Sequence, residues 1–119
     1  MNIVYASDDN FAEIMGVSML SLFENNKDES EIIAYVLDSD IKDDNREKLG
    51  SLAEQYGRQL VFVSTKDVSG QLNSVKQDRG GASQFARLFL SKLLPDTCER
   101  ALYIDCDTIV RHSLKDLYE

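Results

Sequence analysis

Apolar residues follow two different spacings along this chain, and the two spacings alternate. Short continuous apolar runs such as Ile3-Val4-Tyr5-Ala6 predict buried strands, whereas apolar residues three or four apart predict amphipathic helices. The predicted strands are residues 2–6, 31–37, 60–64 and 100–104, and the predicted helices are residues 10–23, 43–56 and 83–94. An extended segment at 108–110 and a helical turn at 114–117 follow the last strand.

The first two predicted helices carry recognisable end signals. Asn10 with Glu13 is typical of a capping box, which predicts where the first helix begins. Gly57 stands where the residue after a helix C-cap is usually glycine. The residues expected to face the core are Phe11, Ile14, Met15, Met19 and Leu22 in the first helix, and Leu49, Leu52, Ala53 and Tyr56 in the second.

Strands that alternate with helices predict an α/β fold with a mostly parallel sheet and helices on both faces. Ligands of such sheets bind beyond the carboxyl ends of the strands, where the strand order reverses. If the first and fourth strands flank that point, the polar residues 7–10 and 105–107 converge on one crevice. No Gly-x-Gly-x-x-Gly or Walker loop follows the first strand, which disfavours a dinucleotide or ATP cradle.

A polar stretch, residues 65–82, interrupts the alternation and contains Gly70, Gly80 and Gly81. Loops of this length within a compact domain are usually functional or mobile. The apolar helix predicted after it ends before Pro95, the only proline of the chain.

The chain has 119 residues, enough for one domain with a core of its own, and a formal net charge of −8. This charge and the lack of a Lys/Arg cluster argue against nucleic acid as a partner. Two cysteines, Cys98 and Cys106, do not make a disulfide framework. With no leader sequence and no apolar run long enough to span a bilayer, we expect a cytoplasmic protein, peripheral to a membrane at most.

Asp105 and Asp107 directly follow the fourth predicted strand, one residue apart. Side chains of an extended chain repeat every second residue, so both carboxylates are expected on one side, with Cys106 directed the opposite way as a small apolar residue. Paired carboxylates at this position suit a hard divalent cation that completes its coordination with diphosphate oxygens. The pattern therefore indicates a nucleotide-diphosphate site.

A second triplet, Asp38-Ser39-Asp40, also follows an apolar run. Spacing alone permits a metal site at either triplet. For each, the structural alternative is an acidic cap whose second Asp opens the next helix.

Three segments resemble the amino-terminal part of family 8 glycosyltransferases, retaining enzymes with the GT-A fold. They are Ile3 to Phe11 at the start, Phe85-Ala86-Arg87-Leu88-Phe89-Leu90 with Leu93-Leu94-Pro95 in the centre, and Ala101 to Val110 at the metal-binding strand. Their order and spacing carry the resemblance, which extends over essentially the whole chain and favours Asp105/Asp107 as the metal-binding triplet.

The resemblance implies a donor-binding half of a metal-dependent glycosyltransferase. Asp105 and Asp107 would ligate Mn²⁺ or Mg²⁺ on the diphosphate of a UDP-sugar such as UDP-glucose or UDP-galactose. The implied donor-binding residues are Ala6, Ser7, Asp8, Asn10, Arg87, Asp105 and Cys106. Within this set, Asp8 and Asn10 would bind uracil and ribose, and Arg87 the phosphate or sugar. The hexose would pass, with retention, to a saccharide or lipid-linked saccharide.

Simpler roles exist for several of these residues. Asp8 and Asn10 could cap the first helix, and Arg87 could lay its stem along apolar neighbours. His112, the only histidine, is a weak candidate for a third metal ligand because the segment before it leads away from Asp107.

Family members are longer, and the resemblance implies that their later half supplies a metal-binding His, a phosphate-binding Lys and the acceptor site. We therefore expect residues 1–119 to be the donor-binding half of a larger enzyme, weakly active or inactive alone, with apolar surface that promotes self-association. Two alternatives remain: a folded fragment that binds nothing tightly, and a phospho-acceptor receiver domain. A receiver needs an Asp at the end of the third strand, where this chain has Ser64 and reaches Asp67 only later.

Overall fold

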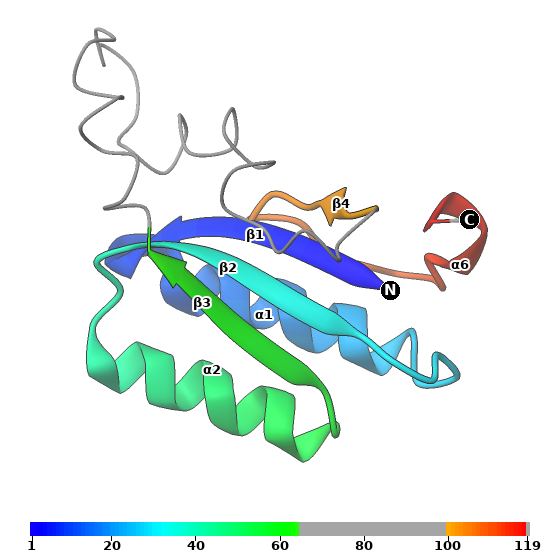
Figure 1. The fold of residues 1–119 in the computed structure, drawn as a ribbon, viewed down its shortest axis with the longest axis horizontal. Helices are drawn as coiled ribbons and strands as arrows, with labels where there is room; N and C mark the ends of the chain where they lie inside the picture. Colours follow the sequence, from blue (N-terminus) through cyan, green and yellow to red (C-terminus); the bar gives the residue numbers. More distant parts are fainter. Residues whose placement is uncertain (65–99, 119) are drawn as a thin grey trace, which may run out of the picture.

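A computed structural model describes residues 1–64 and 100–118 and shows a four-stranded parallel sheet in the order β3-β2-β1-β4 (Figure 1). The strands are β1 (Asn2–Asp8), β2 (Ile33–Ser39), β3 (Gln59–Ser64) and β4 (Leu102–Tyr103). They confirm the predicted strands, although β2 begins and ends two residues later and β4 is only two residues long. The order reverses at β1, because β2 and β3 extend the sheet to one side of it and β4 pairs on the other.

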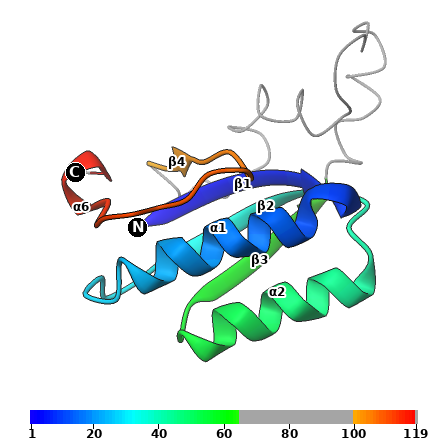
Figure 2. The ribbon, with the colours of Figure 1, turned by 180° about the vertical axis from the view of Figure 1, so that it is seen from behind.

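Two α-helices cover one face of this sheet (Figures 1 and 2). They are α1 (Ala12–Glu24), preceded by the short 3₁₀ helix η1 (Asp9–Phe11), and α2 (Asp43–Gln55). Both connect neighbouring parallel strands in the same direction, and right-handed crossovers then place both helices on the same side. The predicted helix at residues 83–94 and the polar stretch at 65–82 lie outside the described residues.

Both faces of the two central strands are buried. Ile3, Tyr5, Ala34 and Val36 belong to one cluster with the inward residues of α1 and α2, such as Met19. A second cluster contains Val4, Tyr35 and Leu37. Burial on both faces explains why these strands are continuously apolar in sequence.

The buried face of α1 differs from the prediction. Met15, Met19 and Leu22 are buried as expected, but Phe11 is 51% and Ile14 44% exposed. The buried residues of α1 are Ala12, Met15, Ser18, Met19, Leu22 and Phe23. The helix is therefore rotated from its predicted orientation, with a serine in the core.

The predicted capping box of Asn10 and Glu13 is also wrong. The chain first forms η1, whose cap is Asp8: its Oδ1 accepts a hydrogen bond from the amide of Phe11 at 3.2 Å. In α2, by contrast, Leu49 and Ala53 are buried and Leu52 and Tyr56 pack against them, as predicted. Gly57 follows the C-cap with a φ of 65°, in the left-handed region that glycine adopts without strain.

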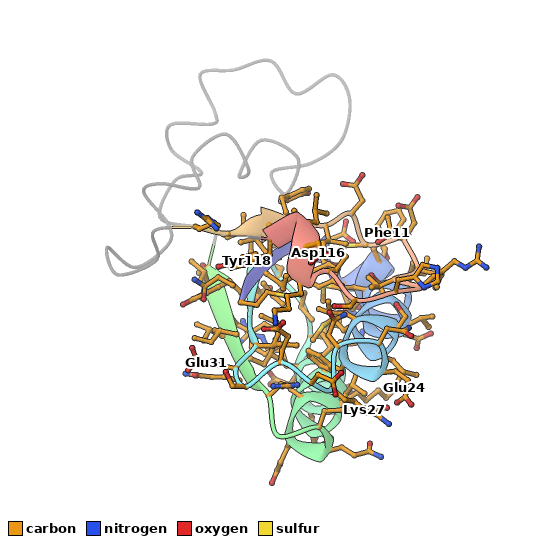
Figure 3. The ribbon with its side chains drawn as sticks, turned by 90° about the vertical axis from the view of Figure 1, so that its right-hand side faces the viewer. Phe11, Glu24, Lys27, Glu31, Asp116 and Tyr118 are labelled. Carbon is orange, nitrogen blue, oxygen red and sulfur yellow. The ribbon has the colours of Figure 1, made fainter. Side chains whose placement is uncertain are left out.

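After β4 the chain turns back along α1. The Val110 amide donates to Ser21 Oγ at 2.8 Å, and the Leu114 amide donates to Asn26 Oδ1 at 2.8 Å. The segment ends in α6 (Lys115–Tyr118), beside the start of β1, where the Asn2 amide donates to the Tyr118 hydroxyl at 3.1 Å. Figure 3, which faces the end of the molecule where α6 lies, shows Tyr118 above the sheet and Glu24 with Lys27 at the end of α1.

Within the described ranges, no helix has both the length and the apolar character needed to cross a bilayer.

Candidate nucleotide-sugar site at the β1–β4 switch point

The strand order reverses between β1 and β4, and the chain stays beside β1 after β4 ends. The Ile104 amide donates to the Val4 carbonyl at 2.9 Å, and the Cys106 thiol donates to the Ala6 carbonyl at 2.9 Å. These two bonds carry residues 104–106 along β1 toward its carboxyl end. Asp105 is thereby brought near the end of β1, which is the convergence that the sequence predicts for this edge.

The Cys106 thiol lies close to negative charge. Burial raises its pKa, a hydrogen bond with Ser7 lowers it, and the negative charges of Asp105, Asp107 and Asp8 raise it further. Asp105 and Asp107 flank Cys106 in sequence, and Asp8 ends the strand whose Ala6 carbonyl accepts from the thiol. Negative charge at this end of β1 favours a bound cation.

The side chains of the triplet alternate as expected. Asp105 and Asp107 are exposed, whereas Cys106 is half-buried, packs against the core and is a free thiol. Cys98 lies outside the described residues. The predicted packing of Cys106 is confirmed, and the two aspartates are open to a ligand approaching the sheet edge.

The end of β1 and the 3₁₀ helix η1 that follows it contribute further polar groups. Ser7 is buried and donates its hydroxyl hydrogen to the Asp8 carbonyl at 2.8 Å, while Asn10 is exposed. Asp8 does act as a cap, but the cap uses only its Oδ1. The carbonyl of Ala6 accepts from Cys106 and has a second lone pair. Of the residues implied by the resemblance, Arg87 lies outside the described part of the chain.

Asp9 has a role that no local sequence signal indicated. Its Oδ1 accepts hydrogen bonds of 2.9 Å from both the Lys42 amide and the Asn45 side chain. These bonds lower the pKa of Asp9, the Lys42 bond having the larger effect. Asp9 therefore connects η1 to the N-terminal end of α2.

The rival triplet does not form a comparable pair. Asp38 is buried, accepts a hydrogen bond from the Ile41 amide at 2.7 Å and forms an ion pair with Arg46. Asp40 is exposed and has a φ of 65°. It does not open the next helix, which begins at Asp43 after an N-cap at Lys42. The expectation that the second Asp of this triplet opens a helix is wrong, and Asp38 instead stabilises the loop before α2.

His112 belongs to the segment that returns along α1 after the aspartates. It lies between Val110 and Leu114, whose amides bond to Ser21 and Asn26 near the C-terminal end of α1. Because α1 runs back toward the amino ends of the strands (Figure 1), the segment that carries His112 leads away from the end of β1, although His112 and Asp105 line the same groove.

The family of the chain follows from comparison with known proteins. The model of glycosyl transferase family 8 matches residues 2–119. The chain belongs to this family. The receiver-domain alternative is therefore wrong, in agreement with the end of β3 at Ser64.

Individual family 8 relatives match along the full chain. General stress protein A of Bacillus subtilis is 30% identical over 120 residues, which cover 100% of this chain and 42% of that protein. A putative glycosyltransferase of Haemophilus influenzae is 31% identical over 118 residues, covering 99% of this chain and 35% of that protein. The chain thus spans about two fifths of the length of these relatives.

The fold is that of GT-A glycosyltransferases. The galactosyltransferase LgtC, solved in complex with donor and acceptor sugar analogues, superimposes with a TM-score of 0.81 at 30% sequence identity. The match covers 98% of this chain and 41% of LgtC. The predicted fold class is confirmed.

The residues of this family 8 chain fit a hard divalent cation in part. Asp105 and Asp107 supply exposed carboxylate oxygens, the ligands that Mg²⁺ and Mn²⁺ prefer, and Asp8 is the last residue of β1. In residues 1–64 and 100–118, no three His, Cys, Asp or Glu side chains converge as a complete metal centre. A cation held here would take its other ligands from a diphosphate, water or other protein groups.

Proposed function

We propose that this family 8 chain binds the nucleotide-sugar donor of a glycosyltransferase that moves a hexose from UDP-glucose or UDP-galactose to a saccharide or lipid-linked saccharide, with retention at the anomeric carbon. The observation that carries the proposal is the position of Asp105 and Asp107 beside the carboxyl end of β1, where the hydrogen bonds of Ile104 and Cys106 hold the chain at the β1–β4 switch point. This is the place at which open α/β sheets bind their ligands. The complex of LgtC with donor and acceptor sugar analogues supports the class of substrate.

Each residue has a role that follows from its chemistry. Asp105 and Asp107 would hold Mn²⁺ or Mg²⁺, which when bound neutralises charge on the diphosphate. Asp8, through the oxygen not used in capping, accepts well from the imide N–H of uracil, and Asn10 can donate to or accept from a ribose hydroxyl. Arg87 suits a phosphate or sugar hydroxyl. Ala6 and Ser7 contribute main-chain groups beside them.

Donor binding and transfer are separate proposals, because the chain spans about two fifths of its relatives. We assign donor binding to residues 1–119 and acceptor positioning to the additional length of such proteins. Near-attack positioning accounts for roughly 7–11 kcal/mol of barrier lowering, so this chain alone should show at most slow donor hydrolysis.

An assay with UDP-glucose or UDP-galactose, Mn²⁺ and a panel of sugar acceptors tests the proposal. Transfer with retention by a protein that contains this chain is the expected result, and the chain alone should show little transfer. Robust transfer by the 119-residue chain would contradict the assignment of acceptor positioning elsewhere. The second candidate function is a folded fragment without donor affinity, which would show no heat of UDP binding with or without Mn²⁺.

We also propose that the chain resides in the cytoplasm. The free thiol of Cys106 supports a reducing compartment. Fractionation of cells that express the native protein tests this, and recovery from an extracellular fraction would contradict it.

A further inference from the structure

A row of hydroxyl groups connects the core of the molecule to the turn that carries the two aspartates. Tyr5 Oη lies 2.9 Å from Ser18 Oγ, and Ser18 Oγ lies 3.2 Å from Thr108 Oγ1. Thr108 Oγ1 in turn donates to the main-chain oxygen of Asp105 at 2.7 Å. The row therefore runs from β1 through α1 to the turn from Asp105 to Thr108, which contains both aspartates.

The direction of this row follows from counting protons. Each hydroxyl has one proton, and the Asp105 carbonyl can only accept, so the Thr108 proton is used on that carbonyl. Ser18 must then donate to Thr108, and Tyr5 must donate to Ser18. Every hydroxyl in the row donates one hydrogen bond, and the hydrogen bonds of such a row strengthen one another cooperatively.

The anchored end of the row is rigid. Tyr5 and Ser18 are fully buried, on β1 and α1 respectively, and belong to elements packed in the core. Thr108 is half-buried and closes a four-residue turn from Asp105 to Thr108. The position of Asp105 and Asp107 relative to β1 is thus tied to the core through one threonine hydroxyl, in addition to the Cys106 bond on the other side.

We infer that Thr108 is a positioning residue for the cation site, which it serves through the hydrogen bond to Asp105 and the anchor at Ser18. The inference rests on the proposed function, in that it takes Asp105 and Asp107 as the cation-binding pair. Groups that orient metal ligands from behind typically change metal affinity by about 10- to 100-fold when removed. Thr108 supplies no ligand itself.

Matched variants separate positioning from general stability. Thr108→Val keeps the shape of the side chain and removes the hydroxyl, whereas Thr108→Ser retains the hydroxyl. Ser21→Ala is the control, because the Ser21 hydroxyl accepts from the Val110 amide at 2.8 Å and donates to the Ser18 carbonyl at 2.6 Å. It thus holds the same returning segment to the same helix, but beyond the aspartates.

Two measurements on the 119-residue chain test the inference. The first is amide hydrogen exchange at residues 105–108 without metal, where Thr108→Val should accelerate exchange about three- to tenfold. The second is a Mn²⁺ titration of UDP binding, where Thr108→Val should raise the half-saturating Mn²⁺ concentration about tenfold. Thr108→Ser and Ser21→Ala should stay within about twofold of wild type in both.

The possible outcomes are distinct. Unchanged exchange and unchanged Mn²⁺ dependence in Thr108→Val would overturn the inference, as would equal shifts in Ser21→Ala, which would reveal general destabilisation. If UDP binding by the wild type is indifferent to Mn²⁺, the proposed function fails. The exchange measurement then decides by itself whether Thr108 holds the turn.

Discussion

The Cys106 thiol donates a hydrogen bond of 2.9 Å to the main-chain oxygen of Ala6. The bond extends the contact between β1 and the chain beyond β4, where regular strand pairing has ended at Val4 and Tyr103. It directs the side chain between the two aspartates inward, and the aspartates themselves remain exposed.

Replacing this thiol should loosen the edge of the sheet. Cys106→Ala removes the hydrogen bond and part of a half-buried side chain, so we expect the free energy of unfolding to fall by about 1–2 kcal/mol. Urea unfolding followed by circular dichroism measures this. Arg111→Lys, an exposed change in the returning segment, is the control, and an unaltered midpoint in Cys106→Ala would show that the bond contributes nothing.

We expect Asp38 to stabilise the folded chain and to have no part in binding a metal ion. Asp38→Asn preserves an acceptor for the Ile41 amide but removes the charge that pairs with Arg46, so we expect a loss of about 1–3 kcal/mol in unfolding free energy. Asp40→Asn should change little, because asparagine tolerates the left-handed backbone found there. Equal stability of wild type and Asp38→Asn in urea would refute the structural role.

We expect Asp9 to make the free energy of unfolding depend on pH in the acidic range. Its pKa is lowered in the folded state, so the unfolded chain binds more protons near the ordinary carboxyl pKa. The stability that Asp9 contributes is therefore fully present above the pKa that Asp9 has in the unfolded chain. It is lost as the pH falls through the lower pKa that Asp9 has in the folded protein. Asn45→Ala removes one of its donors and should bring the Asp9 pKa, measured by NMR titration, back toward its usual value. No change in that titration would contradict the assignment.

Exposed apolar side chains on α1 should promote self-association, as expected from the sequence. Phe11, Ile14, Val17 and Leu20 all expose more than two fifths of their surface, and Ile109 is also exposed. Sedimentation at tens of micromolar should show oligomers whose population falls in Val17→Asp. Glu13→Gln, an exposed polar change on the same helix, is the control. A monomer at all concentrations would count against this expectation.

The strands were predictable because their signals are local: continuous apolar runs identify β1 and β2. The sequence did not determine the strand order, so it predicted the convergence of residues 7–10 and 105–107 only on the condition that β1 and β4 are neighbours, and the structure meets that condition. These signals need no knowledge of side-chain contacts.

The predictions from sequence are wrong where a side chain contacts a residue that is distant in the sequence. The buried face of α1 includes Ser18, whose hydroxyl contacts that of Tyr5 on β1 and that of Thr108, 90 residues away, while Ile14 is exposed. Likewise, Asp9 bonds to Asn45, 36 residues away. Helical periodicity carries no information about such contacts.

The central claim is that Asp105 and Asp107 make donor binding depend on a divalent cation. The most direct measurement is calorimetric titration of UDP into the chain with and without Mn²⁺, for wild type, Asp107→Asn and Asp40→Asn. Mn²⁺ should strengthen UDP binding by about tenfold or more, equivalent to about 1.4 kcal/mol, in wild type and in Asp40→Asn, and Asp107→Asn should lose most of that gain. Retention of the Mn²⁺ effect in Asp107→Asn, together with its loss in Asp40→Asn, would contradict the account.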